Sequence, residues 1–255
     1  MTLFDLKGKT AVVTGASRGI GEAIAYRMAE HGAKVVVSSR KLPACQEVVD
    51  KINGDFGEGT AVAIECNISY KEQLQNLVDE SNKAFGKIDI LVCNAAVNPF
   101  FGTSQDIPDD AFDKIMDCNV KSNHWLSQMV APQMAERGDG AIIIISSIGG
   151  LHGSAALGTY AISKAADFQI ARNLAVEYGP KNVRANCIAP GLIKTYFARA
   201  LWEDEKILEG ATSRSPLKRI GMPDEIAGAA VFLASEAGAF MTGQSMVIDG
   251  GNMIA

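Results

Sequence analysis

The sequence lacks a basic block, a cluster of metal-binding side chains and a long hydrophobic run. Its net charge is −5 at pH 7, which argues against a nucleic-acid partner, because phosphate backbones are bound by dense lysine and arginine patches. The three histidines are too scattered to hold a metal, so we expect no metal site. The longest apolar run, near Ala227 to Ala234, is far shorter than the roughly 20 residues that span a bilayer. The start, MTLFDLKGKT, does not resemble a signal peptide, so we expect a cytoplasmic protein without a membrane partner.

The five cysteines are widely spaced along the chain, unlike the close pairs of zinc sites and redox motifs. We therefore interpret them as small, buried apolar residues. They are Cys45, Cys66, Cys93, Cys118 and Cys187. With 255 residues, 47% of them hydrophobic, the chain can bury a substantial core, and we expect one domain over residues 1–255.

Short runs rich in valine and isoleucine alternate with helical segments, a pattern typical of strands buried on both faces. The predicted strands are Thr10 to Val13, Lys34 to Val37, Ala61 to Ile64, Ile88 to Val92, Ala141 to Ile145 and Val183 to Ile188. The predicted helices are Ile20 to Glu30, Pro43 to Ile52, Lys71 to Ala84, Asp109 to Arg137 (bent or broken) and Thr159 to Tyr178. Ser69 with Glu72 predicts a capping box before the third helix. The alternation predicts an α/β fold: a doubly wound parallel sheet of the Rossmann type, flanked by helices, with ligands beyond the carboxyl ends of the strands.

The first strand is followed by the turn TGASRGIG, from Thr14 to Gly21, which opens the next helix. Glycine permits a tight turn and lets backbone N–H groups approach a pyrophosphate, which the N-terminus of a helix attracts. A glycine-rich turn without a ligand is the alternative, but the position in the first strand–helix unit favours nucleotide binding. The predicted contacts are Gly15, Ser17, Arg18, Ile20 and Gly21.

The end of the second predicted strand carries no acidic residue. A carboxylate there would hold the ribose 2′-hydroxyl of NAD, whereas this chain has Ser39, Arg40 and Lys41. Arg40 and Arg18 would instead suit a 2′-phosphate, so we predict NADPH rather than NAD as the cofactor. Solvated surface cations are the alternative interpretation.

Tyr160 and Lys164 stand four residues apart, so on a helix their side chains share one face. An ammonium about 4 Å from a phenol, at an effective dielectric of about 20, favours the phenolate by about 4 kcal/mol. This would lower the tyrosine pKa from about 10 by roughly 3 units, toward a usable acid or base. An ordinary amphipathic helix face is the alternative, although no other tyrosine of the chain has a lysine four residues later.

Taken in order, these motifs resemble those of the short-chain dehydrogenase/reductase family over nearly the whole chain. The matching pieces are TGASRGIG (14–21), NAA (94–96), Asn119, Ser147, YAISK (160–164), Pro190-Gly191 with Thr195, and DGG (249–251). The resemblance implies hydride transfer between a nicotinamide and a carbonyl or secondary alcohol. In it Tyr160 transfers the proton and Ser147 stabilises the oxygen. Lys164 tunes the tyrosine and binds ribose, while the backbone of Asn119 holds a water of the proton relay.

The resemblance also implies further cofactor contacts. These are Asn67, Ile68, Asn94, Ala95, Ala96, Tyr160, Lys164, Pro190, Gly191, Ile193 and Thr195. Asn67 and Ala96 stand where an aspartate and a glycine are usual in the family. Ser146 is the neighbouring candidate for the catalytic hydroxyl, but adjacent strand side chains point to opposite faces, so only one of Ser146 and Ser147 should reach the substrate.

Residues 192–216 resemble the family's variable substrate loop, and their aromatic side chains suggest an apolar substrate. The predicted substrate contacts are Ser147, His152, Tyr160, Leu192, Tyr196, Phe197 and Trp202. The phrases NAAVNPFFG and PGLIKTYFARALW resemble the branch of NADPH-dependent carbonyl and retinol reductases.

We therefore expect an NADPH-dependent reductase of a small apolar ketone or aldehyde, or of the alcohol in reverse. A reductase of 3-oxoacyl thioesters on acyl carrier protein shares these motifs and is the alternative enzyme. Enoyl reductases of the family have a wider tyrosine-to-lysine spacing, which argues against them. The intact catalytic set argues against a nucleotide-sensing module without catalysis. Family analogy implies a homotetramer, with the helix of Tyr160 and the strand near Gln244 to Asp249 at its interfaces.

Overall fold

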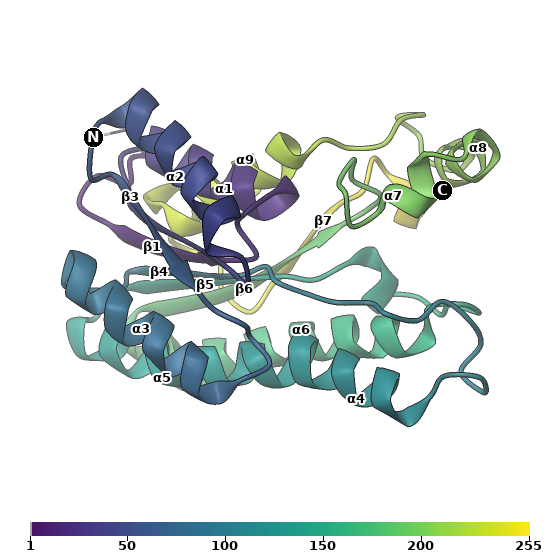
Figure 1. The fold of residues 1–255 in the computed structure, drawn as a ribbon, viewed down its shortest axis with the longest axis horizontal. Helices are drawn as coiled ribbons and strands as arrows, with labels where there is room; N and C mark the ends of the chain where they lie inside the picture. Colours follow the sequence, from purple (N-terminus) through teal and green to yellow (C-terminus); the bar gives the residue numbers. More distant parts are fainter. Residues whose placement is uncertain (1) are drawn as a thin grey trace.

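The structure is a computed structural model that describes residues 2–255, apart from the side chain of Ile207. Seven parallel strands form one sheet in the order β3-β2-β1-β4-β5-β6-β7 (Figure 1). The strands are β1 (Thr10–Thr14), β2 (Lys34–Ser39), β3 (Ala61–Glu65), β4 (Ile90–Cys93), β5 (Gly140–Ile145), β6 (Val183–Pro190) and β7 (Ser245–Ile248). The predicted fold class is confirmed, and β7 lies where family analogy placed a C-terminal strand.

Helices cover both faces of the sheet (Figure 1). One face carries α1 (Gly19–Glu30), α2 (Leu42–Phe56) and α9 (Pro223–Ala234). The other face carries α3 (Lys71–Phe85), α5 (Ser122–Arg137) and α6 (Gly158–Tyr178), with α4 (Asp109–Met116) leading into α5. The short helices α7 (Arg199–Trp202) and α8 (Glu205–Ser213) lie apart from these layers, on the right in Figure 1.

The strands are apolar throughout because both of their faces are buried. Along β1, Ala11 and Val13 join the core under α1, α2 and α9, whereas Val12 between them joins the core under α3, α5 and α6. Side chains alternate across a strand, so one five-residue strand serves two cores. All five cysteines are buried and unpaired, as the sequence predicted.

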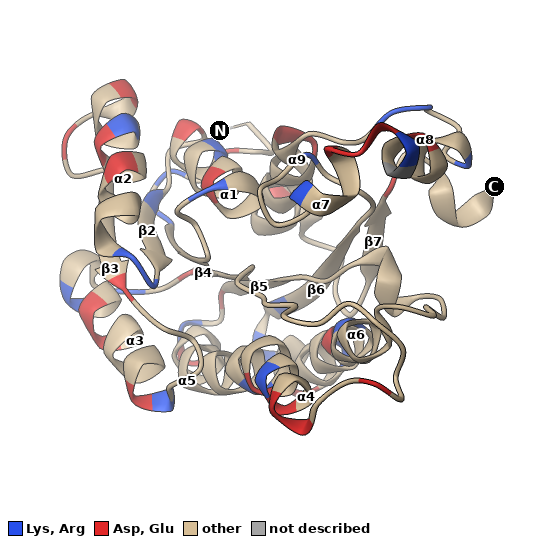
Figure 2. Cartoon of the chain, turned by 45° about the vertical axis from the view of Figure 1, so that its right-hand side comes forward, with Lys and Arg blue, Asp and Glu red and all other residues tan. Residues whose placement is uncertain are grey.

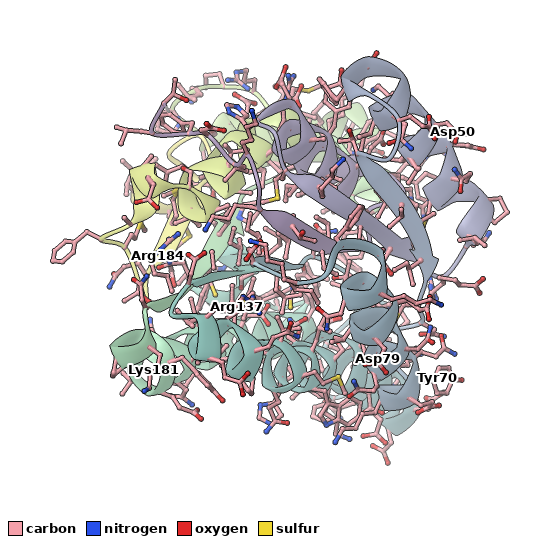
Figure 3. All side chains as sticks on the ribbon, turned by 90° about the vertical axis from the view of Figure 1, so that its left-hand side faces the viewer. Asp50, Tyr70, Asp79, Arg137, Lys181 and Arg184 are labelled. Atoms are coloured by element: carbon pink, nitrogen blue, oxygen red, sulfur yellow. The ribbon has the colours of Figure 1, made fainter. Side chains whose placement is uncertain are left out.

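The carboxyl ends and the amino ends of the parallel strands serve different purposes. The strand order reverses between β1 and β4, and ligands of open α/β sheets bind beyond the carboxyl ends of the strands at such a point. At the amino ends of the strands, Arg137 and Arg184 hold neighbouring segments together by hydrogen bonds to backbone carbonyls (Figure 3). There Arg184 donates to the carbonyls of Leu233 and Gly238 at 2.6 and 3.0 Å, and Arg137 donates to that of Ile88 at 2.5 Å.

The structure tests two expectations about helices. The capping box at Ser69 is wrong, because α3 begins one residue later than the box requires and Tyr70 occupies the N-cap. The Ser69 hydroxyl instead accepts a hydrogen bond from Lys114 at 2.9 Å and lies 3.0 Å from the Cys118 sulfur. The helix expected to be bent or broken between residues 109 and 137 is not broken: its backbone stays helical, with a π turn at Asp117–Lys121 between α4 and α5.

Candidate active site

The glycine turn packs against β4 too closely for side chains. Gly15 has φ +63°, and a Cβ on it would lie 2.9 Å from the Ala95 Cα. A Cβ on Gly21 would lie 2.4 Å from the Gly15 carbonyl oxygen. The Asn94 amide fixes this contact by donating to the carbonyls of Thr14 and Gly15 at 2.9 and 3.1 Å. The Asn94 amide nitrogen is therefore engaged by the turn itself. A cofactor contact by Asn94 would have to come from another of its atoms.

Helix α1 starts within this turn without a side-chain cap. Its N-cap is Arg18, in extended conformation, and no side chain accepts a hydrogen bond from the first turn of the helix. Free N–H groups at the start of a 12-residue helix form a site suited to a pyrophosphate. The glycine turn and the open helix end thus fit the phosphates of a dinucleotide.

The predicted adenosine side lies next to this turn, because the Ala16 N–H donates to the Ser38 carbonyl at the end of β2 at 3.0 Å. Arg40 is exposed there, and the Ser39 hydroxyl lies 3.1 Å from the Cys45 sulfur. The Asn67 side chain accepts from the Ser69 N–H at 3.2 Å, and Ile68 is buried. β2 itself ends without a carboxylate, as the sequence indicated, but Glu65 at the end of β3 pairs with Ser39.

Ser147 and Tyr160 lie together at the carboxyl end of β5. The Ser147 hydroxyl accepts from the Gly149 N–H at 3.0 Å and lies near enough to the Tyr160 phenol to lower its pKa in part. Ser146 points the other way and donates to the Lys164 carbonyl at 2.7 Å. The structure therefore brings Ser147, and not Ser146, to the phenol.

Lys164 lies behind the tyrosine with only 2% of its surface exposed. Its Nζ is 5.8 Å from the centroid of the Tyr160 ring and donates to the Ile145 carbonyl at 2.9 Å. A second donated bond, 3.1 Å long, goes to the Asp167 carboxylate, one turn further along α6. Burial lowers the pKa of Lys164, but Asp167 and the phenol outweigh burial, so its pKa lies above the ordinary value and the amine stays charged.

The expected fall in the pKa of Tyr160 is wrong for this site. Burial disfavours the phenolate more than the Lys164 ammonium and the Ser147 hydroxyl favour it, and Asp167 adds its own repulsion. The pKa of Tyr160 therefore lies above its ordinary value of 10.0. The sequence spacing indicated the lysine but not the burial or the carboxylate beside it.

Asn119 lies within the π turn and is fully buried. Its side chain exchanges hydrogen bonds with the backbone of Val97 at 2.8 and 3.0 Å and donates to the Ser163 hydroxyl at 3.1 Å. The Asn119 carbonyl accepts from the Asn123 amide at 2.8 Å. The side chain thus ties the π turn to the loop after β4 and to α6, while the carbonyl faces the Asn123 and Asp167 network.

The predicted nicotinamide side follows β6. Gly191 donates to the Ile248 carbonyl at 2.9 Å, and a Cβ on it would lie 2.8 Å from the Asp249 Cα. Ile193 is buried and bridges to Gly221. The Thr195 methyl lies 3.3 Å from where a Gly19 Cβ would stand, so this segment meets the glycine turn.

Aromatic residues of the loop at 192–216 stand before Tyr160. The Phe197 ring centroid is 6.2 Å from that of Tyr160, and 57% of Phe197 is exposed. The Arg18 guanidinium stacks on the Tyr196 ring, 4.3 Å from the ring centroid. The Trp202 indole N–H donates to the Thr195 carbonyl at 2.8 Å. His152 is exposed and contacts the carbonyl of Gly153, its neighbour. Leu192 is half-buried in the same loop.

Several site residues were not singled out from the sequence. A small hollow borders Tyr160, and it is lined in part by Asn98 and Leu157, which were missed, and by Phe100, a predicted wall of the site. The Asn98 amide oxygen is buried there without a hydrogen-bond partner. Asp167 and Asn123 were also missed, although an acid three residues after Lys164 is a recognisable signal on a helix.

The described residues contain no group of three or more His, Cys, Asp or Glu side chains that could bind a metal. Among the helices of residues 2–255, none combines the length and the apolar character needed to cross a membrane.

Comparison with known proteins agrees with this geometry. A family model described as "Enoyl-(Acyl carrier protein) reductase" matches residues 15–252. "Dehydrogenase/reductase SDR family member 4" of Bos taurus is 45% identical over 97% of this chain and 88% of its own. A solved 7α-hydroxysteroid dehydrogenase, complexed with NADH and 7-oxo glycochenodeoxycholic acid, is 38% identical with a TM-score of 0.93, over 98% of this chain and 96% of that one.

A gluconate 5-dehydrogenase from Burkholderia cenocepacia J2315, solved with NADP and tartrate, is 31% identical with a TM-score of 0.94, over 99% of this chain and 98% of that one. Nearly the whole chain thus matches solved oxidoreductases that were described with nicotinamide cofactors. The same chain carries the glycine turn at the switch between β1 and β4 and the serine, tyrosine and lysine beyond β5. The chain belongs to the short-chain dehydrogenase/reductase family.

Proposed function

We propose that the chain is an NADPH-dependent reductase of apolar ketones or aldehydes. The observation that carries the proposal is the meeting of Ser147, Tyr160 and Lys164 at the same end of the sheet as a turn in which Gly15 and Gly21 have no room for a side chain. A family fold alone would leave the chemistry open, whereas these groups supply an acid, a hydrogen-bond donor and a cation at one place.

NADPH, when bound beside the glycine turn, would supply a hydride to the carbonyl carbon. The Tyr160 phenol gives its proton to the carbonyl oxygen, which completes the alcohol, and the Ser147 hydroxyl donates to the same oxygen as its charge develops. The raised pKa of Tyr160 suits this direction, because the phenol stays protonated at neutral pH and is ready to act as an acid. Lys164 stays charged and would meet the ribose with the N–H that its two protein partners leave free.

The preference for NADPH rests on Arg40 and on the missing acid at the end of β2. The related solved structures do not decide it, since one is described with NADH and another with NADP. The apolar substrate rests on Phe197, which is 57% exposed beside the Tyr160 ring, and on the exposed Tyr196 of the same loop. One related structure holds 7-oxo glycochenodeoxycholic acid, a steroid ketone, which is consistent with an apolar substrate.

The direct test is a spectrophotometric screen of ketones, aldehydes and their alcohols with NADPH and NADH, using the wild type, Tyr160→Phe and Ser147→Ala. We expect turnover with NADPH to fall by about 10²-fold or more in each variant, because removal of a proton donor or an oxyanion donor typically costs that much. Near-native turnover of Tyr160→Phe with normal NADPH binding would contradict the mechanism. NADPH binding without oxidation of any substrate would instead favour the nucleotide-sensing alternative.

A 3-oxoacyl thioester reductase stays the second candidate, because the matching family model is described as an acyl carrier protein enzyme. An acidic carrier needs a basic docking surface, and Figure 2 shows lysine and arginine mixed with aspartate and glutamate on α2, α3 and α4. Adding a 3-oxoacyl thioester to the screen separates the two candidates, since higher kcat/KM for the thioester than for free ketones would favour this one.

We also propose a cytoplasmic homotetramer by analogy with the family. Apolar side chains exposed on α6 and β7 support it, namely Ile162, Val176 and Val247. Light scattering after size exclusion would test it, and a monomer at assay concentrations would contradict it.

A further inference from the structure

Asp167 is a buried carboxylate that the proposed reaction does not use. It lies on α6, one turn after Lys164, and none of its surface is exposed. Its Oδ2 accepts from the Lys164 Nζ at 3.1 Å, and its Oδ1 accepts from the Asn123 amide at 2.9 Å. Two donors on two different oxygens suit an ionised carboxylate, which accepts on both, better than a protonated acid.

Stability does not explain this ion pair. Desolvation of two charges costs about as much as their attraction returns, and apolar replacements of buried pairs are often neutral or stabilising. The buried positions of α6 that follow Asp167 are apolar, as Phe168, Ala171 and Leu174 show. An aspartate among them needs a reason other than packing.

One effect of Asp167 is to orient Lys164. An ammonium has three N–H donors, and here two are engaged by the Ile145 carbonyl and by Asp167. Both partners are buried and belong to regular elements, so the amine cannot rotate freely. The third donor is left for the side that faces the tyrosine and the cofactor.

A second effect reaches the π turn. The Asn123 amide nitrogen donates to Asp167 and also to the Asn119 carbonyl, at 2.9 and 2.8 Å. One carboxylate therefore connects the lysine on α6 with the backbone of the π turn before α5.

We propose that Asp167 is a positioning residue, which fixes the Lys164 ammonium and, through Asn123, the Asn119 carbonyl. The inference rests on the proposed function, because these two groups matter to turnover only if the chain is a reductase of this kind.

The arrangement has an electrostatic signature. The titratable groups that face Lys164 and Tyr160 are Asp167 on α6, Cys187 on β6 and Cys93 on β4. Burial raises the pKa of both thiols, so they stay neutral in an ordinary assay range; Arg172 faces Cys187 from α6 and lowers the pKa of that thiol in part. Burial raises the pKa of Asp167, while the Lys164 ammonium and the Asn123 amide favour its ionised form. As an anion Asp167 opposes the phenolate, so its removal should lower the pKa of Tyr160.

Asp167→Asn tests the inference, with Glu177→Gln as the matched control. Glu177 is an exposed carboxylate on the same helix, so the control removes the same charge from the same element. The ionisation of Tyr160 is followed by ultraviolet absorbance, as the difference between each protein and its Tyr160→Phe counterpart. The pH profile of ketone reduction with NADPH is measured in parallel, and circular dichroism melts establish that each variant is folded.

For Asp167→Asn we expect the pKa of Tyr160 and the alkaline limb of the reduction profile to move down by about half a unit or more. We also expect kcat to fall by about tenfold or more, since displaced catalytic groups lose rate steeply. Glu177→Gln should change neither. An unchanged or upward-moving Tyr160 ionisation, or a loss of kcat with an unchanged pH profile, would overturn the positioning role.

If Asp167→Asn does not fold, Asn123→Ala carries the test, because it keeps the Lys164–Asp167 ion pair and removes the amide that donates to both Asp167 and the Asn119 carbonyl. We expect several-fold lower kcat with an unmoved Tyr160 ionisation, and wild-type kcat would overturn the link. The absorbance titration needs no turnover. A wild type without reductase activity therefore refutes the proposed function, whereas an active wild type with unaffected variants refutes only the role of Asp167.

Discussion

Replacing Gly21, in the first turn of α1, with alanine is expected to distort the glycine turn that precedes this helix. The added Cβ would lie 2.4 Å from the Gly15 carbonyl oxygen and 2.5 Å from the Asn94 amide nitrogen, about an ångström inside ordinary contact. Backbone holds one of these atoms, so the turn or the helix must move. That movement stretches the two hydrogen bonds from Asn94 to Thr14 and Gly15.

The size of the effect follows from these contacts. Forcing one methyl group into a packed site typically costs about 1–3 kcal/mol. Loss of two hydrogen bonds adds roughly 0.5–1.5 kcal/mol each, but the same shift relieves part of the strain. We therefore expect the free energy of unfolding to fall by about 3 kcal/mol, and NADPH affinity to fall by about tenfold or more because the phosphate site is displaced.

Urea unfolding and a fluorescence titration with NADPH measure the two effects. Gly54→Ala is the matched control, because a Cβ on that exposed glycine of α2 would meet nothing within 4 Å. The same substitution should there stabilise the protein by up to about 1 kcal/mol, since alanine is the better helix former. Gly21→Ala with wild-type stability and wild-type NADPH affinity would refute the close approach of the turn to β4.

Two further predictions concern charge. Arg40→Glu should weaken NADPH binding by about tenfold or more and NADH binding much less, because only the first carries a 2′-phosphate; equal losses in titrations would contradict this role. The Arg219 guanidinium, 2.6 Å from Glu225, lowers the pKa of that carboxyl from 4.5 to about 2. The stabilisation is therefore present above 4.5 and lost as pH falls toward about 2, so Arg219→Gln should flatten the fall of Tm over that range. A fall as steep as in the wild type would exclude the pair as a contributor.

Local patterns were enough for β1 to β6, the glycine turn and the Tyr160–Lys164 spacing, whereas β7 was expected only from the family resemblance. Each depends on residues a few positions apart, and valine runs or glycines restrict the backbone wherever they occur. The helix over residues 109–137 was expected to be bent or broken, whereas its backbone stays helical through a π turn. The capping-box prediction at Ser69 was wrong because it depends on the exact residue at which α3 begins. The helix begins one residue later, so Tyr70 and not Ser69 is the N-cap.

Burial and contacts between distant segments could not be predicted in this way. The pKa of Tyr160 depends on how much solvent is excluded around it, and a spacing of four residues carries no such information. The link from Asp167 to Asn123 joins helices whose partners are 44 positions apart. The stacking of Arg18 on Tyr196 joins the glycine turn to the substrate loop and needs the whole sheet between them to be in place.

The π turn at Asp117–Lys121 has a consequence for how this chain tolerates deletions. A π turn accommodates one residue more than an α-helical turn, and each residue of an α-helix rotates the chain by about 100°. Because the π turn already absorbs its extra residue, removing one residue there would leave a continuous helix of ordinary hydrogen bonding and keep α4 and α5 in nearly the same rotation. The buried Ile115 and Leu126 could then both still face the core. A one-residue deletion within the π turn is therefore expected to be tolerated by the packing on either side, whereas the same deletion in α5 would turn the two helices against each other.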